Sequence, residues 1–334
     1  MSETTRTVRW GIMSTARIGT KVSRAIGRAQ AAELVAVASR TRERAQQWAG
    51  EHHVGRFYGS YEALLADPDI DAVYIPLPPS MHADWTIRAA EQGKHVLCEK
   101  PLAANAAEAR EMAHACKQHG VQLMDGVMWV HHDRTRVMRE HLDSGVLGKL
   151  RRVTAAFSFN WDEIPVDNIR LKPELAGGCL GDLGYYCVCA IEWGLSELPV
   201  RVYATARYYN DVDMNLSGVL WFDGDRIASF DCGFDTVYRK WFEVAGTQGS
   251  LVCDDFVVPW EENKARFWLH DSEGKSTTHV VDNCVQEVRM IERFSEIVGS
   301  GQLDDRWPAD AIATMRICDA PAQSARAGQV VEFT

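Results

Sequence analysis

Short, largely apolar runs alternate with longer polar stretches over the first third of the chain. The apolar runs lie at residues 8–13, 34–38, 71–75, 96–98 and 121–125, and helix-forming sequence separates most of them. Repeated units of a buried strand followed by a helix are typical of a parallel sheet with helices on both faces. The pattern therefore predicts a doubly wound α/β domain of the dinucleotide-binding type over residues 1–127.

The pattern changes after about residue 126, where apolar and polar residues alternate. We expect strands at residues 150–160, 200–210, 218–222, 227–232, 241–245 and 265–270, and helices near 134–144, 286–298 and 309–327. Because no long helical crossover joins the later strands, their sheet should be open and mostly antiparallel. The sequence thus predicts an α+β domain over residues 128–334 that binds substrate and mediates oligomerisation.

The turn after the first predicted strand resembles a dinucleotide fingerprint in its position. Gly11 takes the place of the first glycine of G-x-G-x-x-G, while Ser14 and Ala16 stand near the places of the other two. Small residues let the backbone approach a pyrophosphate, and a helix that begins near Thr15 attracts its charge. We expect this segment, through Arg17 and Ile18, to bind the cofactor phosphates.

The end of the second predicted strand bears on the choice of nucleotide. An NAD-binding domain usually carries Asp or Glu there, which holds the ribose 2′-hydroxyl. This chain carries Ser39 and Arg40, with Arg44 close behind. Guanidinium groups pair with a 2′-phosphate. The sequence therefore favours NADP, and NAD use stays open.

A glutamate and a lysine follow the predicted strand at residues 96–98. Glu99 and Lys100 precede Pro101, which stops further strand pairing. In open parallel sheets, ligands bind beyond the carboxyl ends of the strands. We interpret Lys100 as a site residue; a solvated surface pair is the alternative.

A glycine-rich segment in the second part is another site candidate. It runs from Gly177 to Tyr186 and suggests a loop that leads into a helix. A spacing of four residues would place Asp182 and Tyr186 on one face of that helix.

Composition narrows the class of protein. The formal net charge is −10, and basic residues are scattered, which argues against a nucleic-acid partner. No apolar run reaches membrane-spanning length, and the polar start lacks a signal-peptide core, so we expect a cytoplasmic protein without a membrane partner. The nine cysteines form no C-x-x-C pair and fit reduced, buried positions, and we expect no metal site.

Together these motifs resemble the Gfo/Idh/MocA oxidoreductase family. The resemblance spans nearly the whole chain and rests on four segments: the first turn, the loop at Pro76 and Leu77 with His82, the E-K-P motif, and the D-x-x-x-Y segment. It implies an N-terminal Rossmann domain and a C-terminal domain with a large open sheet. Residues 80–85 and 168–170 resemble a branch that includes sugar dehydrogenases, deoxysugar 3-ketoreductases and dihydrodiol dehydrogenases.

The resemblance also implies roles for individual residues. Tyr186 would be the acid/base of a hydride-transfer reaction on a sugar or cyclic polyol, and Lys100 would lower its pKa. The Lys100–Pro101 bond is typically cis in the family. Asp182 would bind the sugar or orient Lys100, or else act as a helix-terminal carboxylate. The cofactor-site residues would include Pro76, Leu77, His82, Glu99 and Lys100.

Several interpretations remain open at this stage. Trp161 and Arg170 lie on segments that suit substrate binding, although a tryptophan is more often packed in a core and an arginine more often forms a structural ion pair. A trans-dihydrodiol dehydrogenase and a non-catalytic NADP-binding regulator are the alternative functions. Family members commonly pair through the sheet, so the resemblance implies a homodimer or homotetramer.

Overall fold

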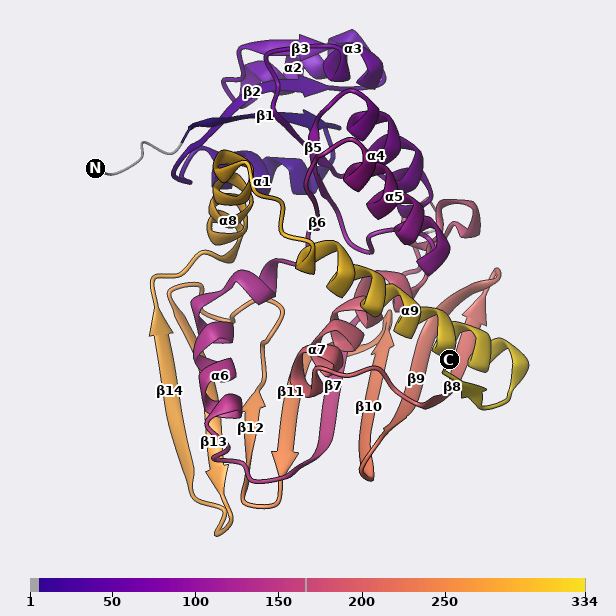
Figure 1. The fold of residues 1–334 in the computed structure, drawn as a ribbon. Helices are drawn as coiled ribbons and strands as arrows, with labels where there is room; N and C mark the ends of the chain where they lie inside the picture. The colour runs from indigo at the N-terminus through magenta and orange to yellow at the C-terminus, as the bar shows by residue number, and fades with distance from the viewer. Residues whose placement is uncertain (1–5, 166, 334) are drawn as a thin grey trace. The chain divides into compact units, whose positions relative to one another are not determined.

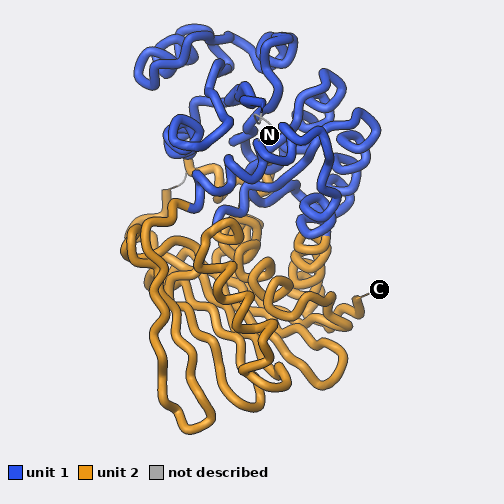
Figure 2. The backbone as a smooth tube through the Cα atoms, turned by 60° about the vertical axis from the view of Figure 1, so that its left-hand side comes forward, with its two compact units in different colours: residues 1–128, 286–312 blue, residues 129–285, 313–334 orange. Residues whose placement is uncertain are grey.

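The chain folds into two units, which a computed structural model describes over residues 6–165 and 167–333 (Figures 1 and 2). Of the described residues, the first unit comprises residues 6–128 and 286–312. The second comprises residues 129–165, 167–285 and 313–333. The sequence placed a single boundary near residue 127, whereas the chain returns to the first unit late in its course.

Six parallel strands form the sheet of the first unit, in the order β3-β2-β1-β4-β5-β6. This is the predicted doubly wound arrangement. The strands are β1 (Val8–Met13), β2 (Ala32–Ala38), β3 (Arg56–Tyr58), β4 (Ala72–Ile75), β5 (His95–Cys98) and β6 (Leu123–Asp125).

Helices connect these strands and start where capping residues allow. Thr41, Ser60 and Asn105 each cap a helix by accepting a hydrogen bond from a backbone N–H in its first turn. The left-handed conformation of Gly93 (φ +68°) follows the end of α4, as its sequence position predicts. The helices are α1 (Arg17–Ile26), α2 (Arg42–Glu51), α3 (Tyr61–Leu65), α4 (His82–Glu91) and α5 (Ala106–Gln118), with a short 3₁₀ helix η1 (Pro79–Met81).

Helix α8 (Gln286–Ser300) joins the first unit although it follows the second sheet in sequence. Its buried face carries Met290, Ile291 and Phe294, which belong to the core cluster around Trp10. The Trp10 and Phe294 rings lie 5.0 Å apart, and the Trp10 indole N–H donates to the Ser295 hydroxyl. This apolar face explains why residues 286–312 pack with the Rossmann sheet.

Nine strands form the sheet of the second unit, in the order β14-β13-β12-β11-β7-β10-β9-β8-β15. Among the described strands of this sheet, β7 and β10 are parallel and the other neighbouring pairs are antiparallel, so the sheet is mostly antiparallel as predicted. The strands are β7 (Leu150–Asn160), β8 (Arg201–Tyr209), β9 (Val212–Phe222), β10 (Arg226–Gly233), β11 (Asp235–Gly246), β12 (Gly249–Cys253), β13 (Lys264–Asp271), β14 (Ser276–Asp282) and β15 (Val331–Glu332).

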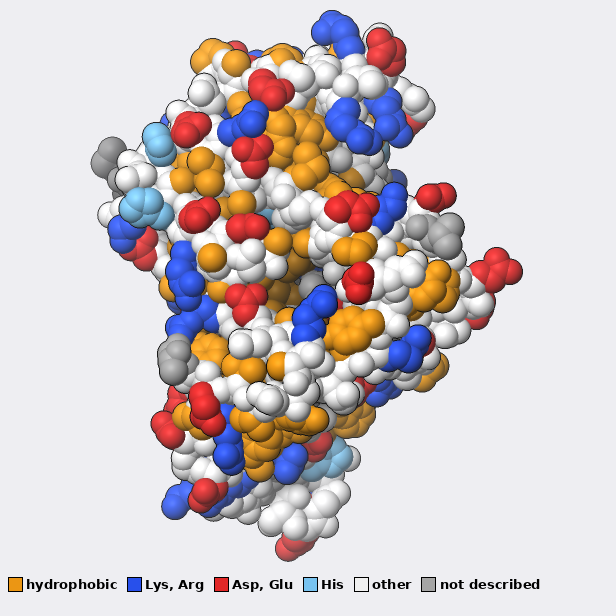
Figure 3. Space-filling model, turned by 90° about the vertical axis from the view of Figure 1, so that its right-hand side faces the viewer, with side chains coloured by type: hydrophobic (Ala, Val, Ile, Leu, Met, Phe, Trp, Pro, Cys, Tyr) orange, Lys and Arg blue, Asp and Glu red, His pale blue; other side chains and the backbone are white. Residues whose placement is uncertain are grey.

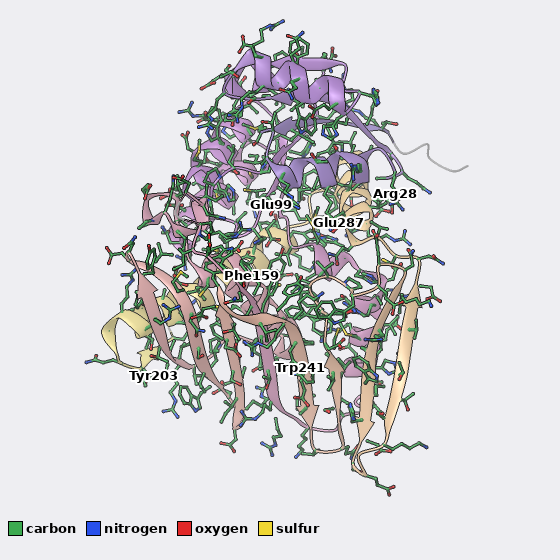
Figure 4. The ribbon with its side chains drawn as sticks, turned by 180° about the vertical axis from the view of Figure 1, so that it is seen from behind. Arg28, Glu99, Phe159, Tyr203, Trp241 and Glu287 are labelled. Atoms are coloured by element: carbon green, nitrogen blue, oxygen red, sulfur yellow. The ribbon has the colours of Figure 1, made fainter. Side chains whose placement is uncertain are left out.

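Helices cover one face of this sheet (Figure 1). Helix α7 packs on β7, β10 and β11, and α6 packs on β13 and β14. Seen from behind in Figure 4, the other face carries no helix and presents Tyr203 and Trp241. The helical segments are η2 (Met128–His131), α6 (Asp133–Asp143), η3 (Ile169–Leu171), η4 (Pro173–Leu175), the π-helical η5 (Leu180–Gly184), α7 (Tyr185–Leu195) and α9 (Arg306–Ala327).

The described residues were also searched for membrane-spanning helices and for clusters of metal-binding side chains. None of their helices is long and apolar enough to cross a membrane. Over residues 6–165 and 167–333, no group of three or more His, Cys, Asp or Glu side chains is placed to hold a metal ion. None of the nine cysteines forms a disulfide, and burial raises the thiol pKa of Cys116 and of Cys253 to about 12. On the face seen in Figure 3, acidic and basic side chains are intermixed.

Candidate functional site

The first turn of α1 is suited to an anion. Its N-cap residue is Ala16, no side chain caps the helix, and no acidic residue occupies the first turn. The Ser14 hydroxyl accepts a hydrogen bond from the Ala16 N–H, which fixes the turn after β1. Backbone N–H groups at such a helix start, together with the helix dipole, favour a phosphate. The chain from Ser14 to Ile18 thus fits the pyrophosphate of a dinucleotide.

Gly11 has a different position from the one the fingerprint suggested. It lies inside β1, where the pairing with β2 is irregular between Trp10 and Gly11, rather than in the turn. A Cβ atom at Gly11 would come within 3.1 Å of Leu64 and 3.2 Å of Ile70. Its small size therefore serves the packing of β1 against neighbouring side chains.

Tyr61 interacts both with the turn after β1 and with Arg40 and Arg44. Burial raises the pKa of Tyr61, whereas Arg40, Arg44 and a hydrogen bond with Ser14 act in the opposite direction. Tyr61 thus lies within electrostatic reach of both guanidinium groups while its hydroxyl meets Ser14. Both arginines are exposed, and Ser39 is buried at the end of β2. This arrangement fits the 2′-phosphate of NADP.

The E-K-P motif is held in place by buried partners. The Tyr74 hydroxyl donates to Glu99 Oε1 at 2.5 Å, and the backbone N–H of Lys100 donates to Glu99 Oε2 at 3.2 Å. The Lys100–Pro101 peptide bond is cis, as the family resemblance implied. A Cβ at Gly126 would come within 3.0 Å of Glu99 Oε1, so a glycine is needed there. Glu99 therefore orients the backbone that carries Lys100.

His82 joins the loop after β4 to the loop after β5. Its ring is fully buried, with Nδ1 2.9 Å from the Pro101 carbonyl oxygen and Nε2 2.8 Å from that of Leu77. Burial lowers the pKa of His82, and the two carbonyl contacts act in the opposite direction. The buried ring makes His82 a residue that positions Leu77 and Pro101.

We expect His82→Ala to destabilise the first unit. A buried polar group that loses its partner costs about 1–3 kcal/mol, and the change removes the ring N–H donor from a buried backbone carbonyl oxygen. The free energy of unfolding, measured by urea denaturation, should fall by at least about 1 kcal/mol on this basis. The exposed His114 on α5 provides the matched control, His114→Ala, which should have little effect. Equal stability of the two variants would contradict this role of His82.

In the second unit, Asp182 is paired with Arg170. The Arg170 Nε donates to Asp182 Oδ2 at 2.5 Å, and the Asp182 side chain is 14% exposed. The sequence left Arg170 open between a substrate role and a structural pair, and the structure brings the two predicted residues together. Their ion pair presents an Asp182 carboxylate of fixed orientation.

The segment that carries Asp182 is wound differently from an ordinary helix start. Residues Leu180–Gly184 form a π-helical turn, and the α-helix begins only at Tyr185. The four-residue spacing of Asp182 and Tyr186 therefore does not correspond to one α-helical turn, as the sequence interpretation assumed. Such π turns occur often at functional sites. Of the two adjacent tyrosines, Tyr185 is fully buried and Tyr186 is partly exposed.

Asp213 of β9 anchors the glycine-rich segment. Its Oδ2 accepts hydrogen bonds from the Leu180 N–H at 2.6 Å and from the Cys179 thiol at 3.1 Å. Gly178 has a φ of +128°, and a Cβ there would come within 2.2 Å of Asp213 Oδ1. The glycine pair thus lets the backbone approach a half-buried carboxylate that fixes the start of the π turn.

The raised pKa of Asp213 should be visible in the pH dependence of stability. Burial raises its pKa above the ordinary value, so the folded chain binds this proton more strongly than the unfolded chain does. The contribution of Asp213 to the free energy of unfolding therefore falls as the pH rises from about 4 through the folded-state pKa. Asparagine does not titrate, so Asp213→Asn does not lose stability in this way. The free energy of unfolding of Asp213→Asn relative to wild type should therefore increase as the pH rises over the same range.

Urea denaturation at several pH values measures this difference, and the exposed Asp223 supplies the control variant Asp223→Asn. A difference between Asp213→Asn and wild type that stays constant or shrinks as the pH rises would contradict the assignment.

Trp161 packs among other aromatic residues. Its ring lies 5.3 Å from that of Phe159 and 4.5 Å from that of Phe234, and its backbone N–H donates to the Phe234 carbonyl. These contacts support the packing interpretation and give no support to a substrate role.

Three residues of the site escaped the sequence analysis: Tyr61, Tyr74 and Asp213. Tyr74 lies in a strand that was predicted, but nothing in an apolar run indicates that its hydroxyl meets Glu99. Asp213 alternates with buried residues along β9, which is the ordinary pattern of a strand. The roles of these three residues depend on contacts between segments that are far apart in the sequence, so no local pattern indicates them.

Comparisons with known proteins agree with this fold. Residues 8–127 match the family model described as "Oxidoreductase family, NAD-binding Rossmann fold", and residues 135–252 match the GFO/IDH/MocA C-terminal domain. A D-xylose 1-dehydrogenase (NADP(+)) of Haloferax volcanii is 39% identical over 97% of this chain and 99% of its own length. A dTDP-3,4-didehydro-2,6-dideoxy-alpha-D-glucose 3-reductase of Saccharopolyspora spinosa is 37% identical over 70% of each chain.

A solved structure is similar over nearly the whole chain. The 3-ketoreductase from Actinomadura kijaniata, in complex with NADP and TDP-benzene, has a TM-score of 0.89 at 28% identity and covers 95% of this chain and 97% of its own. The fold and the matched segments define an oxidoreductase with an NAD(P)-binding Rossmann domain. The chain belongs to the Gfo/Idh/MocA oxidoreductase family.

Proposed function

We propose that the protein is an NADP-dependent sugar dehydrogenase. It oxidises an aldose at C1 to the corresponding lactone. The observation that carries this proposal is the near-full-length similarity to an NADP-dependent D-xylose 1-dehydrogenase in a chain that contains both Lys100 and Tyr186. A non-catalytic NADP-binding regulator has no need of a lysine and a tyrosine that suit proton transfer.

The cofactor half of the site favours NADP. The uncapped start of α1 suits the pyrophosphate, and Arg40 and Arg44 suit the 2′-phosphate. No carboxylate stands at the end of β2 to repel that phosphate. When bound, NADP supplies the hydride acceptor of the reaction.

Side chains of the protein transfer the proton. As the hydride leaves C1, the hydroxyl on that carbon loses its proton to Tyr186, which acts as the general base. The family resemblance implies that the Lys100 ammonium would favour the phenolate form of Tyr186 and hydrogen-bond the substrate oxygen. Asp182, held by Arg170, accepts a hydrogen bond from a neighbouring hydroxyl of the sugar. In the reverse direction Tyr186 donates the proton.

The experiment is a substrate panel with NADP and with NAD, monitored by the absorbance of the reduced nicotinamide. The panel contains aldoses, inositols and an aromatic trans-dihydrodiol. We expect the highest kcat/KM for an aldose with NADP. Faster turnover of the trans-diol would favour a dihydrodiol dehydrogenase instead, and NADP binding without turnover of any compound would favour the regulator.

The bare face of the second sheet supports self-association. Tyr203 is 40% exposed and Trp241 is 39% exposed on strands of this sheet (Figure 4). Exposed apolar area of this kind marks association surfaces. We expect a homodimer or homotetramer by light scattering at micromolar protein concentration. A monomer under those conditions would contradict this.

A further inference from the structure

Two exposed aromatic residues continue a row of rings that begins at Tyr186. The Tyr186 ring meets the Phe157 ring edge-on at 5.6 Å, and Phe157 lies 6.3 Å from Tyr238. Tyr238 in turn meets Trp260 edge-on at 5.4 Å. Phe157 is buried, whereas Tyr238 and Trp260 are each 47% exposed. The row therefore leads from the proposed base to a solvent-facing aromatic surface.

A buried lysine fixes the exposed pair. Lys240 is only 2% exposed, and its Nζ lies 3.5 Å from the centroid of the Trp260 ring and 4.9 Å from that of Tyr238. The same ammonium group donates to the Val258 carbonyl oxygen at 2.6 Å. Cation–π contacts of a desolvated ammonium are among the stronger ones. Lys240 thus holds the two rings nearly perpendicular, at 88°.

The loop that carries Trp260 is anchored as well. Asp255 accepts a hydrogen bond from the backbone N–H of Trp260 at 2.6 Å and forms a buried ion pair with Arg134. Arg134 also donates to the Phe256 carbonyl oxygen. The aromatic pair is therefore ordered before any ligand arrives, and little conformational entropy is lost when a ligand covers it.

We propose that Tyr238 and Trp260 form a wall of the substrate site that recognises a sugar in its ring form. This inference rests on the proposed function and adds to it the form of the substrate. A pyranose presents a face of C–H groups, which packs on an aromatic ring and buries apolar area. An open-chain polyol has no such fixed face, and covering the same rings with it costs more conformational entropy. The wall selects the cyclic aldose over the acyclic alditol.

Calorimetric binding to the NADP-loaded protein tests the wall without turnover. The ring-locked probe is methyl β-D-xyloside, and the open-chain probe is xylitol. We expect wild type to bind the xyloside more tightly than xylitol. One apolar contact in a pocket is worth about 10-fold or more in discrimination, so Tyr238→Leu and Trp260→Leu should weaken xyloside binding by about that factor. Xylitol binding and NADP binding should change little.

Two controls separate the ring from other effects. Tyr238→Phe keeps the aromatic face and should bind the xyloside like wild type. Tyr203→Leu removes an exposed tyrosine from β8, which three strands separate from β11, and should also bind normally.

The outcomes distinguish this inference from the function on which it rests. Equal loss in the Phe and Leu variants at Tyr238 would overturn the wall, as would unchanged xyloside binding in both Leu variants. A fall in molecular mass without a change in xyloside binding would assign the rings to a protein interface instead. If wild type binds the xyloside but reduces NADP with no sugar, the proposed function fails while the wall stands. If wild type binds neither probe but reduces NADP with an aldose, the wall fails while the proposed function stands.

Discussion

Tyr186→Phe should lower kcat for sugar oxidation by about 10²–10⁴-fold, the usual contribution of a general acid or base. The change removes one oxygen from a partly exposed side chain and keeps its ring contact with Phe157. The KM for NADP should change little, because the cofactor-binding residues that we assign lie in the first unit. Steady-state kinetics at saturating NADP measure both quantities.

Lys100→Met provides a second test of the same pair. The proposed mechanism gives the Lys100 cation the role of favouring the phenolate, so in this variant kcat should fall and the optimum pH of the residual activity should move upward. The neighbouring residue Tyr185 is fully buried, and Tyr185→Phe is the control for a hydroxyl loss at the same helix start. Wild-type kcat in both Tyr186→Phe and Lys100→Met would contradict the mechanism.

Replacing Arg40 should change the cofactor preference. A hydrogen bond to a charged group contributes about 1.5–3 kcal/mol, and each 1.4 kcal/mol corresponds to a factor of ten. Arg40→Ser should therefore lower kcat/KM for NADP by about 10–100-fold, and Arg40→Ser/Arg44→Ser should lower it further. The kcat/KM for NAD, which has no 2′-phosphate, should change little.

Arg42 offers the matched control for this prediction. It lies in the same turn, but its guanidinium group stacks over the Phe57 ring at 4.9 Å. Arg42→Ser should keep the preference for NADP. A similar loss with NADP in Arg42→Ser and in Arg40→Ser would assign the effect to the general positive charge of the turn. An unchanged preference in the double variant would refute the cofactor assignment.

Local sequence patterns were sufficient to predict five of the six strands of the first sheet, while the three-residue strand β3 was missed. Continuous apolar runs indicate strands that are buried on both faces, and the capping residues Ser60 and Asn105 indicate where helices begin. The alternating pattern likewise predicted the long strands of the second sheet. These signals lie within a few residues of the element that they specify.

The position of α8 could not be predicted in this way. Its apolar stripe predicts a helix but does not specify which sheet the stripe covers, and its partner Trp10 lies 285 residues from Ser295. Strands β12, β14 and β15 were missed because they are short or polar. Their pairing partners, rather than their own residues, make them strands.

The sequence indicates candidate site residues, but not the contacts that hold them. Glu99, Lys100, Asp182 and Tyr186 stand at motif positions that a sequence displays. The Tyr74 hydroxyl on Glu99, the His82 ring between two carbonyls and the Asp213 carboxylate under Gly178 are long-range contacts. The π turn at Leu180–Gly184 also depends on them, because Asp213 holds the Leu180 N–H at its start.

Isotope transfer tests the central claim most directly. Wild-type protein is mixed with NADP and D-xylose that carries deuterium at C1, and the NADPH formed is analysed by mass spectrometry. The account predicts that one deuterium appears in the nicotinamide ring of the NADPH, because the hydride leaves C1 while Tyr186 takes the hydroxyl proton. NADPH without deuterium would place the oxidation at another carbon, and no NADPH from D-xylose or any other aldose would contradict the proposed function.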